Sequence, residues 1–226
     1  MRNLVFTMML VVSAGCVANG PSQRADSVVE ADRAVVSRLD RVRRRVKPVA
    51  EAECRQTTRL QNCDYLIQLV QDRSDPPNAY QTITDGQPVL IFNIRLLEDV
   101  KNDDELAFIM GHEAAHYILG HLEQKQGNAV AGALGMGVLA IGLGLGDVGI
   151  RAAVEMGGQV GSRVYSKDFE LQADRLGTVI SARSGYDPVL GAEYFNRLTD
   201  PGDQFLGTHP PNPERIRIVR QTAAGL

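Results

Sequence analysis

The spacing of apolar residues predicts a long helix near the start of the chain. Between Asp26 and Lys47 the apolar positions recur every three or four residues, which places them on one face of an amphipathic helix. Pro48 lacks a backbone N–H and its ring clashes with the preceding turn, so we expect the helix to end there. Basic residues gather near this end, where the helix dipole favours them, although contact with anionic lipid headgroups would use the same charges.

A β-hairpin is predicted further along the chain. Two runs with strand-forming residues, 80–84 and 89–93, flank Asp85-Gly86, a pair typical of a type I′ turn. Because Pro88 cannot donate to a hydrogen-bond ladder, we expect one of the two strands to lie at a sheet edge. An edge strand can pair with an extended peptide, which is the functional interpretation of this hairpin. Ordinary sheet structure is the plain interpretation, and the two are compatible.

The next segment begins with a helix-capping pattern. Asn102 is a predicted N-cap, and Glu105 completes a capping box with it. The helix that follows should end near Gly120, and it contains the motif His112-Glu113-x-x-His116. Residues four apart share a helix face, so the two imidazoles can hold one metal ion. Glu113 can then take a proton from water that the metal acidifies, as in zinc hydrolases.

Two histidines need a third protein ligand. His121 does not supply the third histidine of the metzincin pattern, because it falls one residue early. A better candidate is Glu170, in a segment that reads as a helix, and Asp174 one turn later can hold a ligand imidazole by its other nitrogen. Glu-x-x-x-Asp is by itself a common surface pattern, but beside the first motif it predicts the third zinc ligand and its support.

The first residues have the pattern of a targeting segment. Arg2 precedes an apolar run, 4–12, and the small residues 13–15 lead directly to Cys16. This order resembles a bacterial lipobox, in which the cysteine is lipidated, and it implies anchoring to the periplasmic face of the outer membrane. Ser13 stands where that pattern prefers Leu, so a plain secreted protein is the alternative.

Two further cysteines, Cys54 and Cys63, remain once Cys16 is assigned to lipidation. An even pair in an oxidising compartment predicts a disulfide. Zinc binding is the competing interpretation, but two cysteines at this spacing lack further ligands.

Residues 129–146 contain no charge and are a nominal membrane-span candidate. Six of them are glycines, which makes the segment only weakly hydrophobic. We therefore expect a small-residue helix packed closely on a neighbouring helix, or a segment dipping toward a membrane, rather than a spanning helix.

Length and composition fit one domain. The chain has 226 residues, a formal charge of -3 and no Trp, and the absence of a basic excess argues against a nucleic-acid partner. We divide it into a signal peptide (1–15), a tether (16–25), an amphipathic helix (26–48) and a metal-binding domain (49–226). The expected fold is α+β, predominantly α-helical, with a small sheet next to the motif helix.

Five ordered blocks between Asp75 and Ile216 resemble the HtpX-like and Oma-like gluzincin peptidases. The blocks are Asn78-Ala79, Asp104-Glu105-Leu106-Ala107, the zinc motif with Gly120-His121, Glu170-x-x-Ala173-Asp174, and His209-Pro210 followed by Arg215-Ile216. The resemblance implies a zincin-like endopeptidase with one Zn²⁺ held by His112, His116 and Glu170. It also implies that His209 and Arg215 lie near the catalytic cleft. For His209 the alternatives are an oxyanion contact or zinc gate, and a plain turn residue; for His121 they are a structural role and a substrate contact.

The resulting hypothesis is a zinc peptidase that cleaves peptide bonds in misfolded or stalled envelope proteins, with Glu113 as general base. The alternative is a periplasmic chaperone or assembly factor whose zinc site is structural or self-blocked. The intact Glu113 argues against this alternative, because a structural site needs no base beside an open coordination position.

Overall fold

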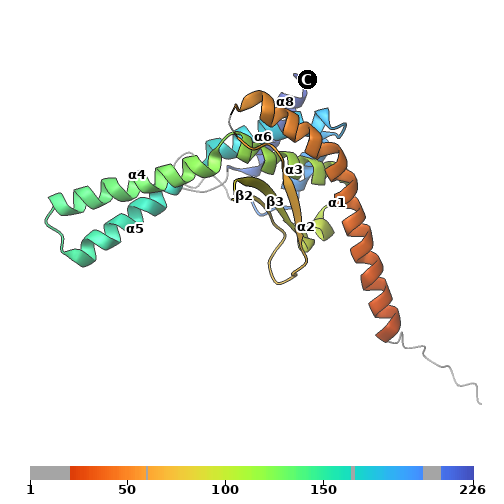
Figure 1. The fold of residues 1–226 in the computed structure, drawn as a ribbon, viewed down its shortest axis with the longest axis horizontal. Helices are drawn as coiled ribbons and strands as arrows, with labels where there is room; N and C mark the ends of the chain where they lie inside the picture. The colour runs from red at the N-terminus through yellow and green to blue at the C-terminus, as the bar shows by residue number, and fades with distance from the viewer. Residues whose placement is uncertain (1–20, 60, 164–165, 201–209) are drawn as a thin grey trace, which may run out of the picture. The chain divides into compact units, whose positions relative to one another are not determined.

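Helices dominate the structure, a computed structural model that describes residues 21–59, 61–163, 166–200 and 210–226 (Figure 1). The helices are α1 (Pro21–Thr57), α2 (Ile94–Asp99), α3 (Asp103–Ile118), α4 (His121–Gly142), α5 (Asp147–Arg163), α6 (Ser166–Arg183), α7 (Pro188–Gly191), the 3₁₀-helix η1 (Ala192–Arg197) and α8 (Asn212–Ala223). The strands are β1 (Leu66–Val70), β2 (Ala79–Thr84) and β3 (Gln87–Asn93). The predicted α+β, mainly helical fold is confirmed. The chain divides into two compact units, Met1–Ala34 and Val35–Leu226.

The sheet has the order β1-β3-β2, with β1 parallel and β2 antiparallel to β3. The predicted hairpin is confirmed: Asp85 and Gly86 connect β2 to β3 with φ angles of 51° and 76°, both positive as a type I′ turn requires. One of the two hairpin strands, β2, lies at the sheet edge as predicted, although Pro88 itself lies on the central strand β3. The central position is possible because Pro88 precedes Val89, the first β3 residue that pairs with β1. The edge strand next to it is β2.

Helix α1 differs from its prediction at both ends. It begins at Pro21, inside the predicted tether, and continues through Pro48 to Thr57. Burial explains the continuation, because Val42, Val46 and Cys54 have no exposed surface. A proline inside a helix costs about 3 kcal/mol, and burying each valine recovers roughly 1.5–3 kcal/mol. The part of α1 from Val35 onward therefore belongs to the same compact unit as the sheet.

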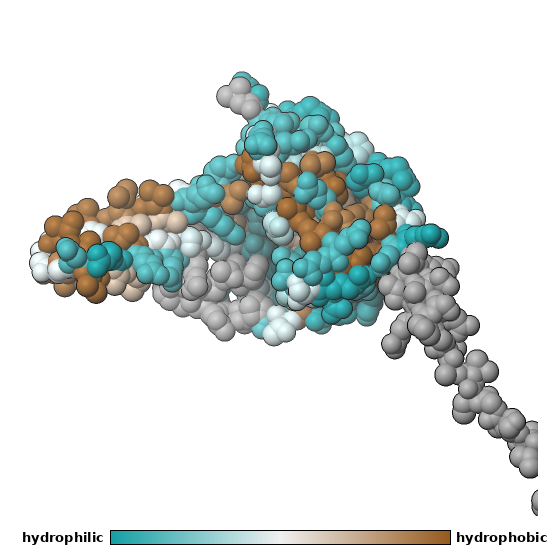
Figure 2. All heavy atoms as spheres, turned by 60° about the horizontal axis from the view of Figure 1, so that its bottom comes forward, coloured by the Kyte–Doolittle hydropathy of each residue, from teal (hydrophilic) through white to brown (hydrophobic). Residues whose placement is uncertain are grey.

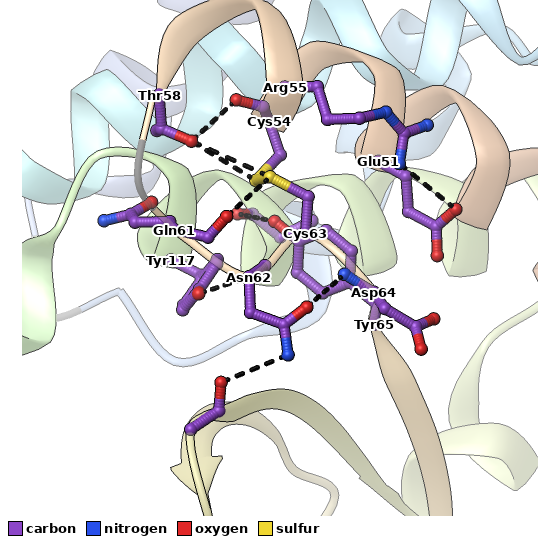
Figure 3. The surroundings of a disulfide bond; sticks show 12 residues. Glu51, Cys54, Arg55, Thr58, Gln61, Asn62, Cys63, Asp64, Tyr65 and Tyr117 are labelled. Carbon is purple, nitrogen blue, oxygen red and sulfur yellow. Dashed lines mark hydrogen bonds and ion pairs between the residues drawn. A yellow bond between two sulfur atoms is a disulfide. The ribbon is translucent and has the colours of Figure 1, made fainter.

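A disulfide joins Cys54, near the end of α1, to Cys63 in the segment before β1 (Figure 3). Both cysteines are buried. Two tyrosines tie this region to α3: Tyr117 donates to the carbonyl oxygen of Asn62 at 2.7 Å, and Tyr65 donates to the carbonyl oxygen of Ala114 at 3.2 Å. The disulfide and these two hydrogen bonds thus link the end of α1 and the segment before β1 to α3.

The cap of α3 fixes where the motif helix starts. The Asn102 side chain accepts from the backbone N–H of Glu105 at 2.8 Å, as predicted. The Glu105 carboxylate accepts from the N–H of Lys101 at 2.8 Å instead of the N–H of Asn102, so the reciprocal bond is shifted by one residue. At the other end, Gly120 adopts a left-handed conformation with φ 66°, and α4 begins immediately after it.

Helices α4 and α5 form an antiparallel pair in which backbones approach closely (Figure 1). A Cβ added to Gly132 of α4 would lie 2.2 Å from the carbonyl oxygen of Gly157 in α5. The predicted small-residue helix packed on a neighbour is therefore confirmed. Among the described residues, no helix is long and apolar enough to cross a membrane.

Candidate metal centre

Two helices meet backbone to backbone at the metal motif. A Cβ on Gly111 of α3 would lie 2.9 Å from the carbonyl oxygen of Gly177 in α6, and a Cβ on Gly177 would lie 2.9 Å from the backbone nitrogen of His112. Only glycine at both positions permits this approach. As a result, the α6 side chains one and two turns before Gly177 reach the α3 histidines.

His112, His116 and Glu170 place three donor atoms around one point. The Nε2 atoms of His112 and His116 are 3.0 Å apart, and each lies 3.4 Å from an oxygen of Glu170. Ligands at about 2.0–2.1 Å from a tetrahedral zinc are separated by roughly 3.4 Å. All three residues are buried. Among the described residues, they form the cluster of ligand side chains that lie close enough together to hold a metal ion. The donor types and their spacing fit zinc.

A buried ion pair supports His112 from behind. Asp174 of α6 lies with one carboxylate oxygen 3.0 Å from His112 Nδ1. Arg215 of α8 donates to both oxygens of Asp174, at 2.8 and 2.7 Å, and its guanidinium lies 3.9 Å over the ring of Phe195. Burial would raise the pKa of Asp174, but the charge of Arg215 and the hydrogen bonds from Arg215 and His112 together lower that pKa.

A second imidazole supports His116. The Nδ1 atoms of His116 and His121 are 2.9 Å apart, and both side chains are buried. The His121 ring stacks on Phe169 of α6, with centroids 4.5 Å apart and an interplanar angle of 15°. Burial lowers the pKa of His121 to about 4, which favours the neutral ring that can accept a hydrogen bond. His121 thus sits behind His116 as Asp174 sits behind His112.

A cleft of about 380 Å³ opens beside the three donor atoms. Glu113 lines it and is partly buried, and burial raises the pKa of its carboxyl group to about 7. One wall comes from the start of β2 and the residues before it, and another from η1. The wall residues are Pro77, Asn78, Ala79, Tyr80, Gln81, Tyr194, Phe195 and Leu198.

The structure brings together most of the residues that the sequence singled out. His112, Glu113, His116, Glu170 and Arg215 line one cleft, with Asp174 directly behind them. His209 and Cys16 lie outside the described residues. The aromatic supports, Phe169 and Phe195, were missed, because a lone phenylalanine in a helix carries no pattern that separates a ring beside a metal site from an ordinary core residue.

Residues 37–223 match the model of peptidase family M48. The chain belongs to this family. The resemblance to HtpX-like and Oma-like gluzincins, drawn from the sequence blocks, is confirmed, and M48 membership makes a metal-dependent peptidase the class to which this site belongs.

Several curated proteins that are similar to this chain are longer than it is. The chain is 31% identical over 140 residues to the putative beta-barrel assembly-enhancing protease of Vibrio cholerae, covering 54% of this chain and 28% of that protein. It is 29% identical over 135 residues to the beta-barrel assembly-enhancing protease of Escherichia coli K12, with the same coverage. It is 28% identical over 167 residues to the mitochondrial metalloendopeptidase OMA1 of Saccharomyces cerevisiae, covering 66% of this chain and 44% of that protein. The matched part therefore spans less than half of each relative.

Proposed function

We propose that the chain is a zinc-dependent endopeptidase of the cell envelope, with His112, His116 and Glu170 as zinc ligands. The observation that carries the proposal is the set of three donor atoms 3.0–3.4 Å apart, bordering a cleft that also contains a glutamate next to the first histidine. A structural zinc site would be closed by a fourth protein ligand and would need no cleft.

The side chains around this centre have distinct tasks. Zinc bound by the three ligands would acidify water and polarise the carbonyl of the scissile bond. Glu113 accepts the proton of the attacking water and passes it to the leaving amine. Asp174 and His121 hold the ligand rings in place through the nitrogens turned away from the metal position. His209 is proposed as a second catalytic group that contacts the oxyanion or gates the site.

The cleft suits an extended, unfolded polypeptide. Strand β2 is an edge strand whose first residues line the cleft, so a substrate segment can add to its free side while its peptide bond reaches Glu113. Misfolded or stalled envelope proteins present such segments. The names of the two bacterial relatives refer to β-barrel assembly, which supports envelope proteins as substrates.

The proposed location is the periplasm, with a lipid at Cys16 holding the chain to the outer membrane. The targeting pattern of residues 1–16 supports this location. The disulfide between Cys54 and Cys63 supports it independently, because such bonds persist in oxidising compartments.

Cleavage of an unfolded protein tests the proposal. The full-length chain, purified in detergent, is expected to cut casein, to lose this activity when a chelator removes its metal, and to regain it with stoichiometric Zn²⁺. Mass spectrometry of the fragments would show internal cuts, as an endopeptidase makes. A chain that binds zinc and casein but produces no fragments would overturn the proposal in favour of a chaperone.

The contact between His121 and His116 leads to a second prediction. A zinc-bound His116 uses Nε2 for the metal, so its Nδ1–H must donate to an acceptor, and the nearest is His121 Nδ1 at 2.9 Å. His121→Phe keeps a ring on Phe169 but removes the acceptor. We expect this variant to bind zinc about ten-fold more weakly in competition with a chromophoric chelator.

His121→Asn is the matched variant, because its side-chain oxygen lies where Nδ1 lies in histidine. We expect it to recover most of the lost zinc affinity. Equal zinc affinity in wild type and His121→Phe would show that the ring has only a packing role, and thermal unfolding of the metal-free variants would report that role separately.

A further inference from the structure

The end of the α4–α5 pair exposes a cluster of apolar side chains. Val138, Leu143 and Val148 are 70%, 68% and 74% exposed, and Leu139, Ile141 and Leu145 are exposed as well. Figure 2 shows this end of the pair as a hydrophobic region, in contrast to the largely hydrophilic surface at the other end of α4. Exposed apolar clusters of this kind mark contacts with proteins or membranes.

The direction of these side chains distinguishes between the two kinds of contact. Successive residues of a helix are about 100° apart, so Val138, Leu139 and Ile141 point to different sides of α4. Leu143 and Leu145 lie at the connection to α5, and Val148 lies in the first turn of α5. The exposed apolar side chains at this end therefore face several sides of the pair, with Asp147 and Arg151 as its exposed charged residues. A folded partner or a second copy would cover one side, whereas a bilayer surrounds an inserted end completely.

The charge distribution agrees with a lipid environment. From residue 126 to residue 150 the chain has a single charged side chain, Asp147. Asp147 stands at the start of α5, where the helix dipole stabilises a carboxylate. The charge of Asp147 excludes deep burial of this end in the hydrocarbon core of a bilayer. None of the described helices can span a membrane. These features together fit shallow insertion at the boundary between headgroups and acyl chains.

We propose that residues 138–148 insert shallowly into a lipid bilayer. This gives the peptidase a membrane contact of its own, separate from any lipid at Cys16 and independent of the metal centre. The glycine contacts between α4 and α5 make the pair a rigid support, because Gly132 and Gly157 leave no room for side chains between the two backbones.

The absence of tryptophan from the chain allows a direct test. Leu143→Trp places the sole tryptophan at the apolar end, and Gln126→Trp places it at an exposed position near the start of α4. Both full-length variants are mixed with vesicles of phosphatidylethanolamine and phosphatidylglycerol, with and without brominated acyl chains. Any anchoring by the N-terminal segment is the same in both. We expect Leu143→Trp emission to shift to shorter wavelength and to be quenched by bromine, and Gln126→Trp emission to change little.

A second set of variants tests the apolar contribution. In an Ile141→Trp background, replacing Leu143 and Leu145 with serine should remove most of the bromine quenching, because each leucine contributes about ten-fold to partitioning into lipid. High salt should reduce the quenching of the parent only slightly, since Arg151 is the basic residue nearest the apolar end.

Two outcomes would overturn the inference. One is Leu143→Trp emission that neither shifts nor is quenched when the protein is bound to vesicles. The other is a shift that appears without vesicles, grows with protein concentration and is insensitive to brominated lipid, which would assign the apolar end to contact between two copies of the chain. Because these side chains are exposed, the substitutions should leave the fold intact, and circular dichroism of each variant checks this.

Discussion

Glu113→Gln is expected to lower kcat for casein cleavage by about 10²–10⁴-fold, the usual contribution of a positioned general base. Glutamine has nearly the same shape as glutamate but cannot accept the proton of the attacking water. The three zinc donors, His112, His116 and Glu170, are untouched by the change, so zinc bound per chain should equal that of the wild type. Kinetics and metal analysis of the same preparation measure both quantities.

Glu123→Gln is the matched control, because Glu123 is exposed in the first turn of α4, ten residues from Glu113. This variant should cleave casein at the wild-type rate. If Glu113→Gln cleaves equally well, Glu113 is not the base and the proton must go elsewhere. If Glu113→Gln loses zinc together with activity, Glu113 helps to form the metal site, and the loss of activity is then no evidence that Glu113 is the general base.

The parts of this centre that sequence reasoning could reach are those fixed by local geometry. His112, Glu113 and His116 lie within one helical turn, so their relation follows from the helix itself. Glu170 lies on α6, 58 residues after His112 in the chain. Its position therefore depends on how α6 packs on α3. That packing is set by the contact between Gly111 and Gly177, and isolated glycines in helical segments do not reveal their partner.

The wrongly predicted helix end at Pro48 and the central position of Pro88 have the same origin. Pro48 and Pro88 each break a local rule, and each position is tolerated for a reason visible only in the fold. Burial of one face of α1 offsets the proline inside that helix, and the short pairing with β1 begins just after the proline of β3. Strand β1 was not predicted, because it has only five residues and four of them are apolar, and so short an apolar run does not distinguish a strand from a helical segment. Tertiary packing decided these features, and local propensity did not.

Arg215→Met is expected to destabilise the metal-free protein by about 3–5 kcal/mol, the cost of removing one partner of a buried ion pair. Asp174 has no exposed surface and Arg215 is 6% exposed, so water cannot replace the lost guanidinium. The remaining carboxylate would be buried beside Glu170 without its cation. Urea unfolding in the presence of a chelator measures the effect without a contribution from zinc binding.

Arg217→Met is the control on the same helix. Its pair with Glu214 is exposed, with about half of each side chain accessible, so its loss should change stability by less than about 1 kcal/mol. The double variant Arg215→Met with Asp174→Asn separates charge from packing, because it also removes the unpaired negative charge. If the double variant regains a substantial part of the loss, the ion pair is what stabilises the fold here. If both variants are equally unstable, the contact of Arg215 with Phe195 matters more, and α8 is held to the metal centre chiefly by packing on that ring.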